Sequence, residues 1–135
     1  MTGATPATEF VTDTVGLVLR LEKRKMGAGA KSVFDSAESG GAIIYVPSLV
    51  LAEMLYLSEK GRITATLHDA ADYMSQHSHC REYPLNLAVV QAAALIPDVR
   101  ELHDRLIAGV ARLLGLQLIT NDLSIQASSF VRTLW

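Results

Sequence analysis

The sequence has little charge, few aromatic residues and a single cysteine. Charged residues fill 19% of the 135 positions and aromatic residues 6%. Half of the residues are hydrophobic, so the chain can build a core and lacks the composition of a disordered protein. One cysteine excludes an intramolecular disulfide and fits a reducing compartment. The length predicts one domain.

An excess of positive charge is also missing. Twelve Lys and Arg residues oppose 14 Asp and Glu residues, for a net charge of −2. This balance excludes a strongly basic nucleic-acid-binding protein, so any contact with RNA or DNA has to use a local patch. Five of the cationic residues fall in one short stretch, which is either a solvated loop or a contact to an RNA backbone. They are Arg20, Lys23, Arg24, Lys25 and Lys31.

Long hydrophobic runs and targeting segments are absent as well. The most apolar stretch, residues 42–57, contains Pro47 and Glu53 and is too short and interrupted to span a membrane. Residues 1–8 lack the basic and apolar segments of a secretory signal. We expect residues 1–8 to form a flexible tail before a single domain of residues 9–135. We expect this domain to reside in the cytoplasm, with no membrane partner.

Strand and helix patterns alternate along the chain. The run at 42–46, bounded by Gly41 and Pro47, is typical of a strand buried on both faces. The alternation predicts an α/β domain with a mostly parallel sheet. The expected strands are residues 9–12, 42–46, 82–85, 116–120 and 130–135, and the expected helices are residues 14–21, 30–38, 48–60, 63–75, 86–95 and 102–114.

Four carboxylates stand at informative positions in this pattern. Asp13 and Asp122 follow two strands, and the carboxyl ends of parallel strands form the edge where ligands bind. Glu53 lies within an apolar helical segment, where an unpaired carboxylate is costly. Asp104 lies in the first turn of its helix. Each has a purely structural alternative. Asp13 could be a helix cap, Asp104 could interact with the helix dipole, and Asp122 could be a turn residue. Glu53 could pair with an Arg or Lys, or lie on a helix rim that reaches water.

Taken together, the four carboxylates suggest a metal site. If their strands are adjacent and parallel, they converge on one crevice and repel one another at neutral pH. A hard divalent cation such as Mg²⁺ relieves this repulsion through oxygen ligands. Such a site activates water and stabilises the leaving oxygen in phosphodiester cleavage.

Four segments, in order, resemble the PIN-domain ribonucleases and, among them, the VapC-type toxins of type II toxin–antitoxin systems. They are Val11-Thr12-Asp13-Thr14, residues 45–53 (YVPSLVLAE), residues 102–108 (LHDRLIA) and Leu118-Ile119-Thr120-Asn121-Asp122. The ending, residues 130–135, is similar to the final strand of that family.

The resemblance implies a three-layer α/β/α sandwich and an endoribonuclease that depends on Mg²⁺ or Mn²⁺. It assigns the catalytic and metal-binding positions to Asp13, Glu53, Asp104 and Asp122, with Thr14, Thr120 and Asn121 in support. It also implies a homodimer, an RNA substrate and a VapB-like antitoxin that blocks the site. The candidate RNA-binding residues are Arg20, Lys23, Arg24, Lys25 and Arg105.

Two other classes of α/β protein also place an Asp after the first strand, but this sequence lacks the further residues that they need. A dehalogenase-like phosphatase needs an acid where Val15 stands, and a receiver domain needs a late lysine, but no Lys follows Lys60. A catalytically inactive PIN-like domain that binds RNA or protein stays open as the alternative, although the intact acidic set argues against it.

Overall fold

The computed structural model describes residues 8–135, in which five strands form one sheet in the order β3-β2-β1-β4-β5. Every neighbouring pair in this sheet is parallel. The elements are β1 (Thr8–Thr12), α1 (Thr14–Leu21), α2 (Ala28–Glu38), β2 (Ala42–Pro47), α3 (Ser48–Glu59), α4 (Leu67–Gln76), β3 (Cys80–Tyr83), α5 (Leu87–Ala94), α6 (Leu102–Leu114), β4 (Gln117–Ile119), α7 (Leu123–Gln126) and β5 (Thr133–Leu134).

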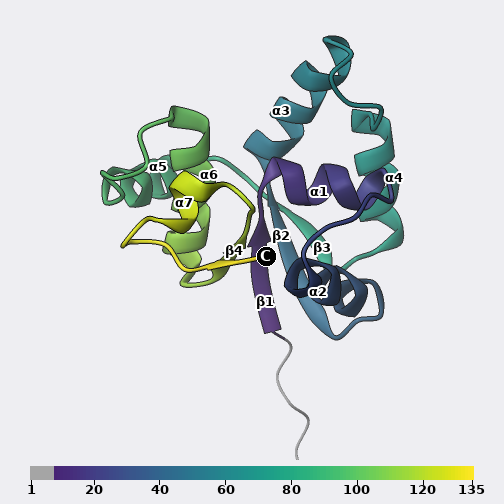
Figure 1. Ribbon diagram of the computed structural model, residues 1–135, viewed down its shortest axis with the longest axis horizontal. Coiled ribbons are helices and arrows are strands. Elements are labelled where there is room, and N and C mark those ends of the chain that lie inside the picture. The colour runs from purple at the N-terminus through teal and green to yellow at the C-terminus, as the bar shows by residue number, and fades with distance from the viewer. Residues whose placement is uncertain (1–7) are drawn as a thin grey trace, which may run out of the picture.

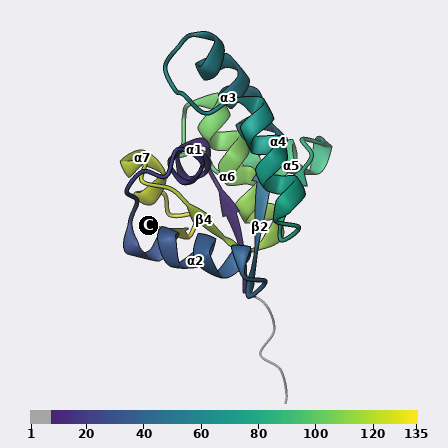
Figure 2. The same cartoon turned by 90° about the vertical axis from the view of Figure 1, so that its right-hand side faces the viewer.

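The helices divide into two layers because the chain reverses its direction across the sheet. From β1 it moves outward to β2 and β3, and it then returns to the far side of β1 for β4 and β5. Right-handed crossovers therefore put α1 to α4 on one face and α5 to α7 on the other (Figure 1). Figure 2 views the molecule from the side of α1 to α4. The expected α/β/α sandwich is confirmed.

The reversal beside β1 creates the topological switch point of the sheet. The backbone N–H of Asp13, directly after β1, donates to the carbonyl of Ile119 at the end of β4 (3.1 Å). Ligands bind α/β sheets in the crevice outside the carboxyl ends of the strands at such a point. Asp13 and the residues after Ile119 therefore stand at the expected place for a binding site.

The core lies on both faces of the central strands. Val11, Ile44 and Leu118 of the three central strands are fully buried, as are Phe34 of α2 and Met54 of α3. Helices cover both faces of the sheet, which is why the middle of each of these strands is buried. Burial of a side chain of this size stabilises the fold by about 1.5–3 kcal/mol relative to exposure.

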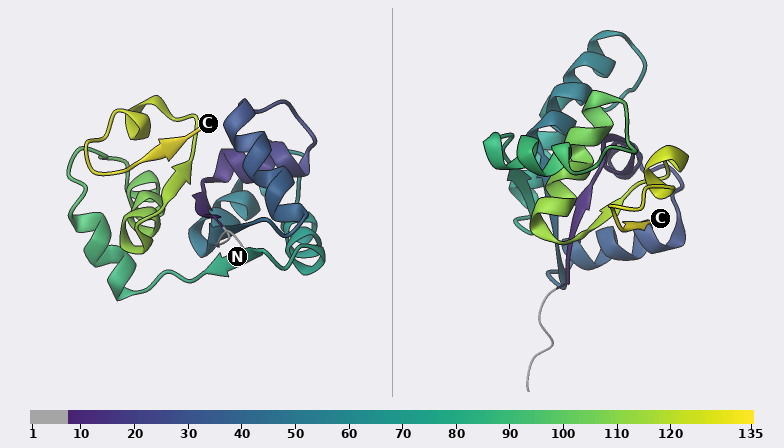
Figure 3. Two further views of the ribbon diagram at one scale, coloured as in Figure 1. Left: turned by 90° about the horizontal axis from the view of Figure 1, so that it is seen from below. Right: turned by 90° about the vertical axis from the view of Figure 1, so that its left-hand side faces the viewer.

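The end of the chain is fastened to the start of α2, and Figure 3 shows the C-terminus beside that helix. The N–H of Ala30 donates to the carbonyl of Trp135 (3.1 Å). A Cβ at Gly27 would lie 2.5 Å from the carbonyl carbon and oxygen of Trp135, which a side chain does not tolerate. The absence of a side chain at Gly27 therefore permits this close approach.

The expected helix over residues 63–75 is wrong in its first turn, because α4 begins only at Leu67. Thr66 and Asp69 form a capping box that starts the helix there. Upstream, one carboxylate oxygen of Glu22 accepts hydrogen bonds from the N–H and hydroxyl of Thr64 and from the N–H of Ala65, at 2.7–3.0 Å. These bonds hold residues 64–65 outside the helix and lower the pKa of Glu22 to about 2.

Other boundaries also differ from the expected ones. The third strand covers Cys80–Tyr83 rather than residues 82–85, since Pro84 has no N–H to continue the ladder. The short helix α7 was not expected. The first strand begins at Thr8, and the rest of the expected tail, residues 1–7, lies outside the described residues. Within residues 8–135, no helix has the length and apolar character needed to cross a membrane.

Replacement of Glu22 by alanine tests the connection between α1 and the start of α4. We expect Glu22→Ala to lower the free energy of unfolding by about 1–3 kcal/mol, because three donors lose a charged acceptor. Urea denaturation measures this change. Glu59→Ala is the control, since Glu59 is exposed at the end of α3. Equal effects of the two substitutions would contradict the role of Glu22.

Candidate active site at the strand ends

Asp13 connects β1 to α1 and has two roles. Its Oδ1 accepts a hydrogen bond from the N–H of Gly16 (2.8 Å), which caps α1. The residue is only 6% exposed. Burial raises the pKa of Asp13 to about 6, and the charges of Asp122 and Glu53 add to the rise, against hydrogen bonds from Thr120 and Gly16. The helix cap proposed from the sequence is thus present, and the same carboxyl group faces other acids.

Glu53 reaches the same region from α3. Its Oε1 accepts a hydrogen bond from the hydroxyl of Thr14 (2.6 Å), and its Oε2 lies 3.6 Å from Nδ1 of His103. No Lys or Arg of residues 8–135 forms an ion pair with Glu53. The cationic partner considered as an alternative is therefore not found there, and a hydroxyl from the first turn of α1 orients this carboxylate.

Asp104 approaches from the opposite layer, in the first turn of α6. Its N–H donates to Oε2 of Glu101, which caps that helix (2.8 Å). The pKa of Asp104 is raised to about 6, and burial is the largest cause. The negative charges of nearby acids add to the rise, and these acids are, in order of effect, Glu101, Asp122, Glu53 and Asp13. The charges of all three other expected site acids therefore act on Asp104.

Asp122 differs from Asp13 and Asp104 in the direction of its pKa shift. Its Oδ1 accepts hydrogen bonds from the N–H and hydroxyl of Ser124 (2.8 and 2.6 Å) and from the N–H of Ile125 (3.1 Å), which cap α7. These donors hold the pKa of Asp122 below its usual value. Its own N–H donates to Thr120 Oγ1 (3.1 Å), which fixes the turn after β4.

The four carboxylates fit a hard divalent cation in their chemistry. They provide only oxygen donors, and the raised pKa values of Asp13 and Asp104 show that their ionised forms lack a countercharge. Over the described part of the chain, no three Asp, Glu, His or Cys side chains already form a ligand group. We infer that a cation would have to draw the carboxylates closer together.

Two of the expected RNA-binding residues have structural partners instead. Arg20 forms ion pairs with Glu38 (2.6 Å) and Asp35 (2.7 Å) and joins α1 to α2. Arg105 donates to the carbonyls of Ala93 (2.8 Å) and Ala94 (3.2 Å), at the end of α5. Both guanidinium groups are thus held by partners other than the four site acids. Lys23, Arg24 and Lys25 lie together in the connection between α1 and α2.

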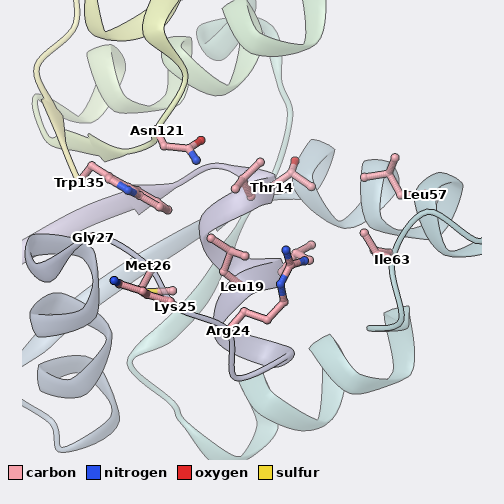
Figure 4. Close-up of a pocket in the computed structure, with 12 residues that line it drawn as sticks. Thr14, Leu19, Arg24, Lys25, Met26, Gly27, Leu57, Ile63, Asn121 and Trp135 are labelled. Carbon is pink, nitrogen blue, oxygen red and sulfur yellow. The ribbon is translucent and has the colours of Figure 1, made fainter.

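A groove of about 620 Å³ runs beside the acids, from Trp135 and Asn121 at one end to Leu57 and Ile63 at the other (Figure 4). Thr14 lines it between these ends, next to the acids. Arg24 and Lys25 also line the groove. The supporting residues Thr14 and Asn121 therefore face this groove, whereas Thr120 is fully buried beneath the site.

Sequence reasoning missed several contributors to the site. Glu101 adds the largest charge effect on Asp104, and its position three residues before Asp104 at a helix start was the available signal. Ser124 holds Asp122, in an Asp-x-Ser spacing typical of a cap. Gly16 leaves room for the site, since a Cβ there would lie 2.6 Å from Thr12 Oγ1 and 3.3 Å from Asp13 Oδ1.

The parallel sheet with an acidic group at its switch point defines an α/β protein with a candidate cation site. The chain matches the PIN domain family over residues 11–130 and belongs to that family. The expected family is thus confirmed. Among curated proteins, sequence comparison finds no match.

Solved structures share the fold over nearly the whole chain. VapBC2 from Rickettsia felis, bound to a promoter DNA fragment, has a TM-score of 0.70 at 15% identity, covering 95% of this chain and 99% of the other. DNA-bound VapBC from Salmonella typhimurium has a TM-score of 0.68 at 19% identity, covering 94% and 97%. VapC20 from Mycobacterium tuberculosis, a toxin that cleaves the sarcin–ricin loop, has a TM-score of 0.59 at 20% identity, covering 91% and 98%.

The raised pKa of Asp13 predicts how metal-free stability depends on pH. The pKa is about 6 in the folded chain and 3.8 without the fold, so the folded state loses stability as pH rises from about 4 to about 6. Asp13→Asn removes the charge and keeps a good cap. We expect this variant to be more stable than the parent by about 1–3 kcal/mol at pH 8 in EDTA, by chemical denaturation.

Asp98→Asn is the matched control for that measurement. Asp98 accepts hydrogen bonds from Ser128 and Ser129, which lower its pKa, so its neutralisation should not stabilise the protein at pH 8. Lower stability of Asp13→Asn than of the parent at pH 8 would contradict the repulsion between the site acids.

Proposed function

We propose that the protein is a metal-dependent endoribonuclease and the toxin of a VapBC-type toxin–antitoxin pair. The observation that carries the proposal is the group of four acids at the switch point of the sheet, in which burial and then neighbouring carboxylates raise the pKa values of Asp13 and Asp104 to about 6. Such a cluster suits Mg²⁺ or Mn²⁺, and membership of the PIN domain family supports a nuclease.

Each acid has a distinct part in the proposed chemistry. Asp13, Glu53 and Asp104 hold the cation, and Thr14 keeps Glu53 aimed at the site through its hydroxyl. A bound cation of this kind activates water and stabilises the leaving oxygen of a phosphodiester. Asp122 uses Oδ1 to cap α7, so its other oxygen is available to orient the attacking water. No side-chain nucleophile is required.

The proposed biological setting follows the similar structures. Several of these are VapBC complexes, so we propose a VapB-like antitoxin as the partner of this chain. We place the pair in the cytoplasm, together with its RNA substrate. The homodimer implied by the sequence resemblance stays a prediction, and exposed Leu87, Val90 and Leu95 offer an apolar surface for it.

Replacement of a site acid should abolish RNA cleavage. We expect Asp104→Asn to reduce the cleavage rate with saturating Mg²⁺ or Mn²⁺ at least about 100-fold, because a cation ligand is lost. Mn²⁺ should raise the Tm of the parent and have less effect on an Asp13→Asn, Asp104→Asn double variant. Gel-based cleavage of labelled RNA and thermal denaturation measure the two effects, with Asp98→Asn as control.

Expression in a bacterial host tests the proposed role as a toxin with the same variants. The parent should arrest growth, and Asp104→Asn should not. If the parent neither binds metal nor cleaves RNA, the inactive PIN-like binding module becomes the better description.

We further propose that Lys23, Arg24 and Lys25 contact the RNA backbone. Arg24 is 64% exposed in its side chain and has one ion pair in the described chain, with Glu22 at 3.2 Å. Reversal of charge at Lys23 and Lys25 should weaken RNA binding and reduce its dependence on salt, because fewer counterions are released. Titrations at several salt concentrations measure the slope, and an unchanged slope would remove these residues from the interface.

A further inference from the structure

The groove beside the acids has the size of a site for a small group. Its volume of about 620 Å³ falls within the range of roughly 300–1,000 Å³ typical of ligand pockets. It opens along α1 and ends at the turn that follows β4. The four acids do not line the groove. A ligand in the groove would therefore lie beside whatever is bound at the acids.

Two side chains connect the groove directly to the acids. Thr14 lines the groove and donates its hydroxyl hydrogen bond to Glu53. Asn121 also lines the groove and is the residue immediately before Asp122. A polymer cut at the acids therefore has its adjoining unit within reach of this groove.

The lining combines aliphatic side chains with an aromatic ring and positive charge. Trp135 and Met26 provide aromatic and thioether surface at one end, and the side chain of Arg24 reaches toward the middle (Figure 4). Single-stranded nucleic acids are bound by this combination, in which bases stack on aromatic rings and cations accompany the phosphates. Bases within a duplex cannot stack in this way, because their faces are already occupied.

The position of Trp135 does not depend on a ligand. Its carbonyl accepts the N–H of Ala30, and its backbone lies against Gly27, so the residue is anchored at the start of α2. Its side chain is only partly buried. A Cβ at Gly27 would also lie 2.6 Å from Cδ1 of Trp135, so the indole itself packs closely against Gly27, and stacking of a base on its exposed part requires little rearrangement.

We infer that this groove binds one unpaired base of the RNA, next to the bond that is cut, with Trp135 as its stacking surface. The inference rests on the proposed function and specifies its substrate as single-stranded at that position. Charge favours this occupant over an apolar protein segment, because Arg24 and Lys25 line the groove and match phosphates.

The fluorescence of Trp135 provides a direct test, since it is the only tryptophan of the chain. A short single-stranded oligoribonucleotide is titrated in EDTA, where no cleavage intervenes, against a matched oligomer with abasic positions. We expect the first to quench the fluorescence and to bind about tenfold more tightly, the size of effect that stacking of one base provides. A duplex of the same sequence should not quench.

Variants separate stacking from a structural role of the residue. Trp135→Leu should bind both oligomers equally, and Trp135→Phe should recover part of the preference for bases, as judged by competition with labelled RNA. Phe130→Ala is the control, because Phe130 is an exposed aromatic residue that does not line the groove.

The outcomes distinguish this inference from the proposed function. Equal affinity for the two oligomers without quenching overturns the base site, even if RNA is cleaved. Quenching by single-stranded RNA supports the base site, even if cleavage fails. Quenching by an antitoxin but not by any RNA assigns the groove to protein binding and also overturns the inference.

Discussion

Burial of carboxylates beside other carboxylates at the strand ends is the constraint on which the rest of the site depends. Asp13 and Asp104 carry pKa values of about 6 because burial and neighbouring acids disfavour their charge. A fold that keeps such groups together stores unfavourable free energy unless a cation is bound. The metal-free fold is thus less stable in this region, and binding of a cation would restore the stability.

The fold maintains this arrangement because helix starts hold the acids. Asp13, Glu101 and Asp122 each cap a helix, so backbone N–H groups compensate part of their cost. Glu53 is held differently, by one hydroxyl from α1. The carboxylates come from both helical layers, and the reversal of strand order beside β1 is what brings these layers together at one edge.

The sequence was sufficient to predict the general architecture, and the roles of the four acids stay a prediction. Buried strands such as β2 are recognisable because their apolar runs are bounded by Gly41 and Pro47. The start of α4 has a local signal, the capping box of Thr66 and Asp69, which the predicted helix overlooked. The bonds that hold residues 64–65 outside the helix were not predictable, because they come from Glu22, more than 40 residues away. The partners of Arg20 and Arg105 were hidden for the same reason: side-chain contacts over long separations decide whether a guanidinium is free for a ligand.

The caps at the site have a consequence for how this fold can evolve. Asparagine caps a helix as well as aspartate does, so the capping positions tolerate loss of the charge without loss of the helix. Such a change also removes repulsion from the folded state. Drift toward a stable domain that binds without cutting therefore meets no structural barrier at Asp13, and only selection for the chemistry opposes it. At Asp122 the fold itself favours the charge, so the same change there costs stability.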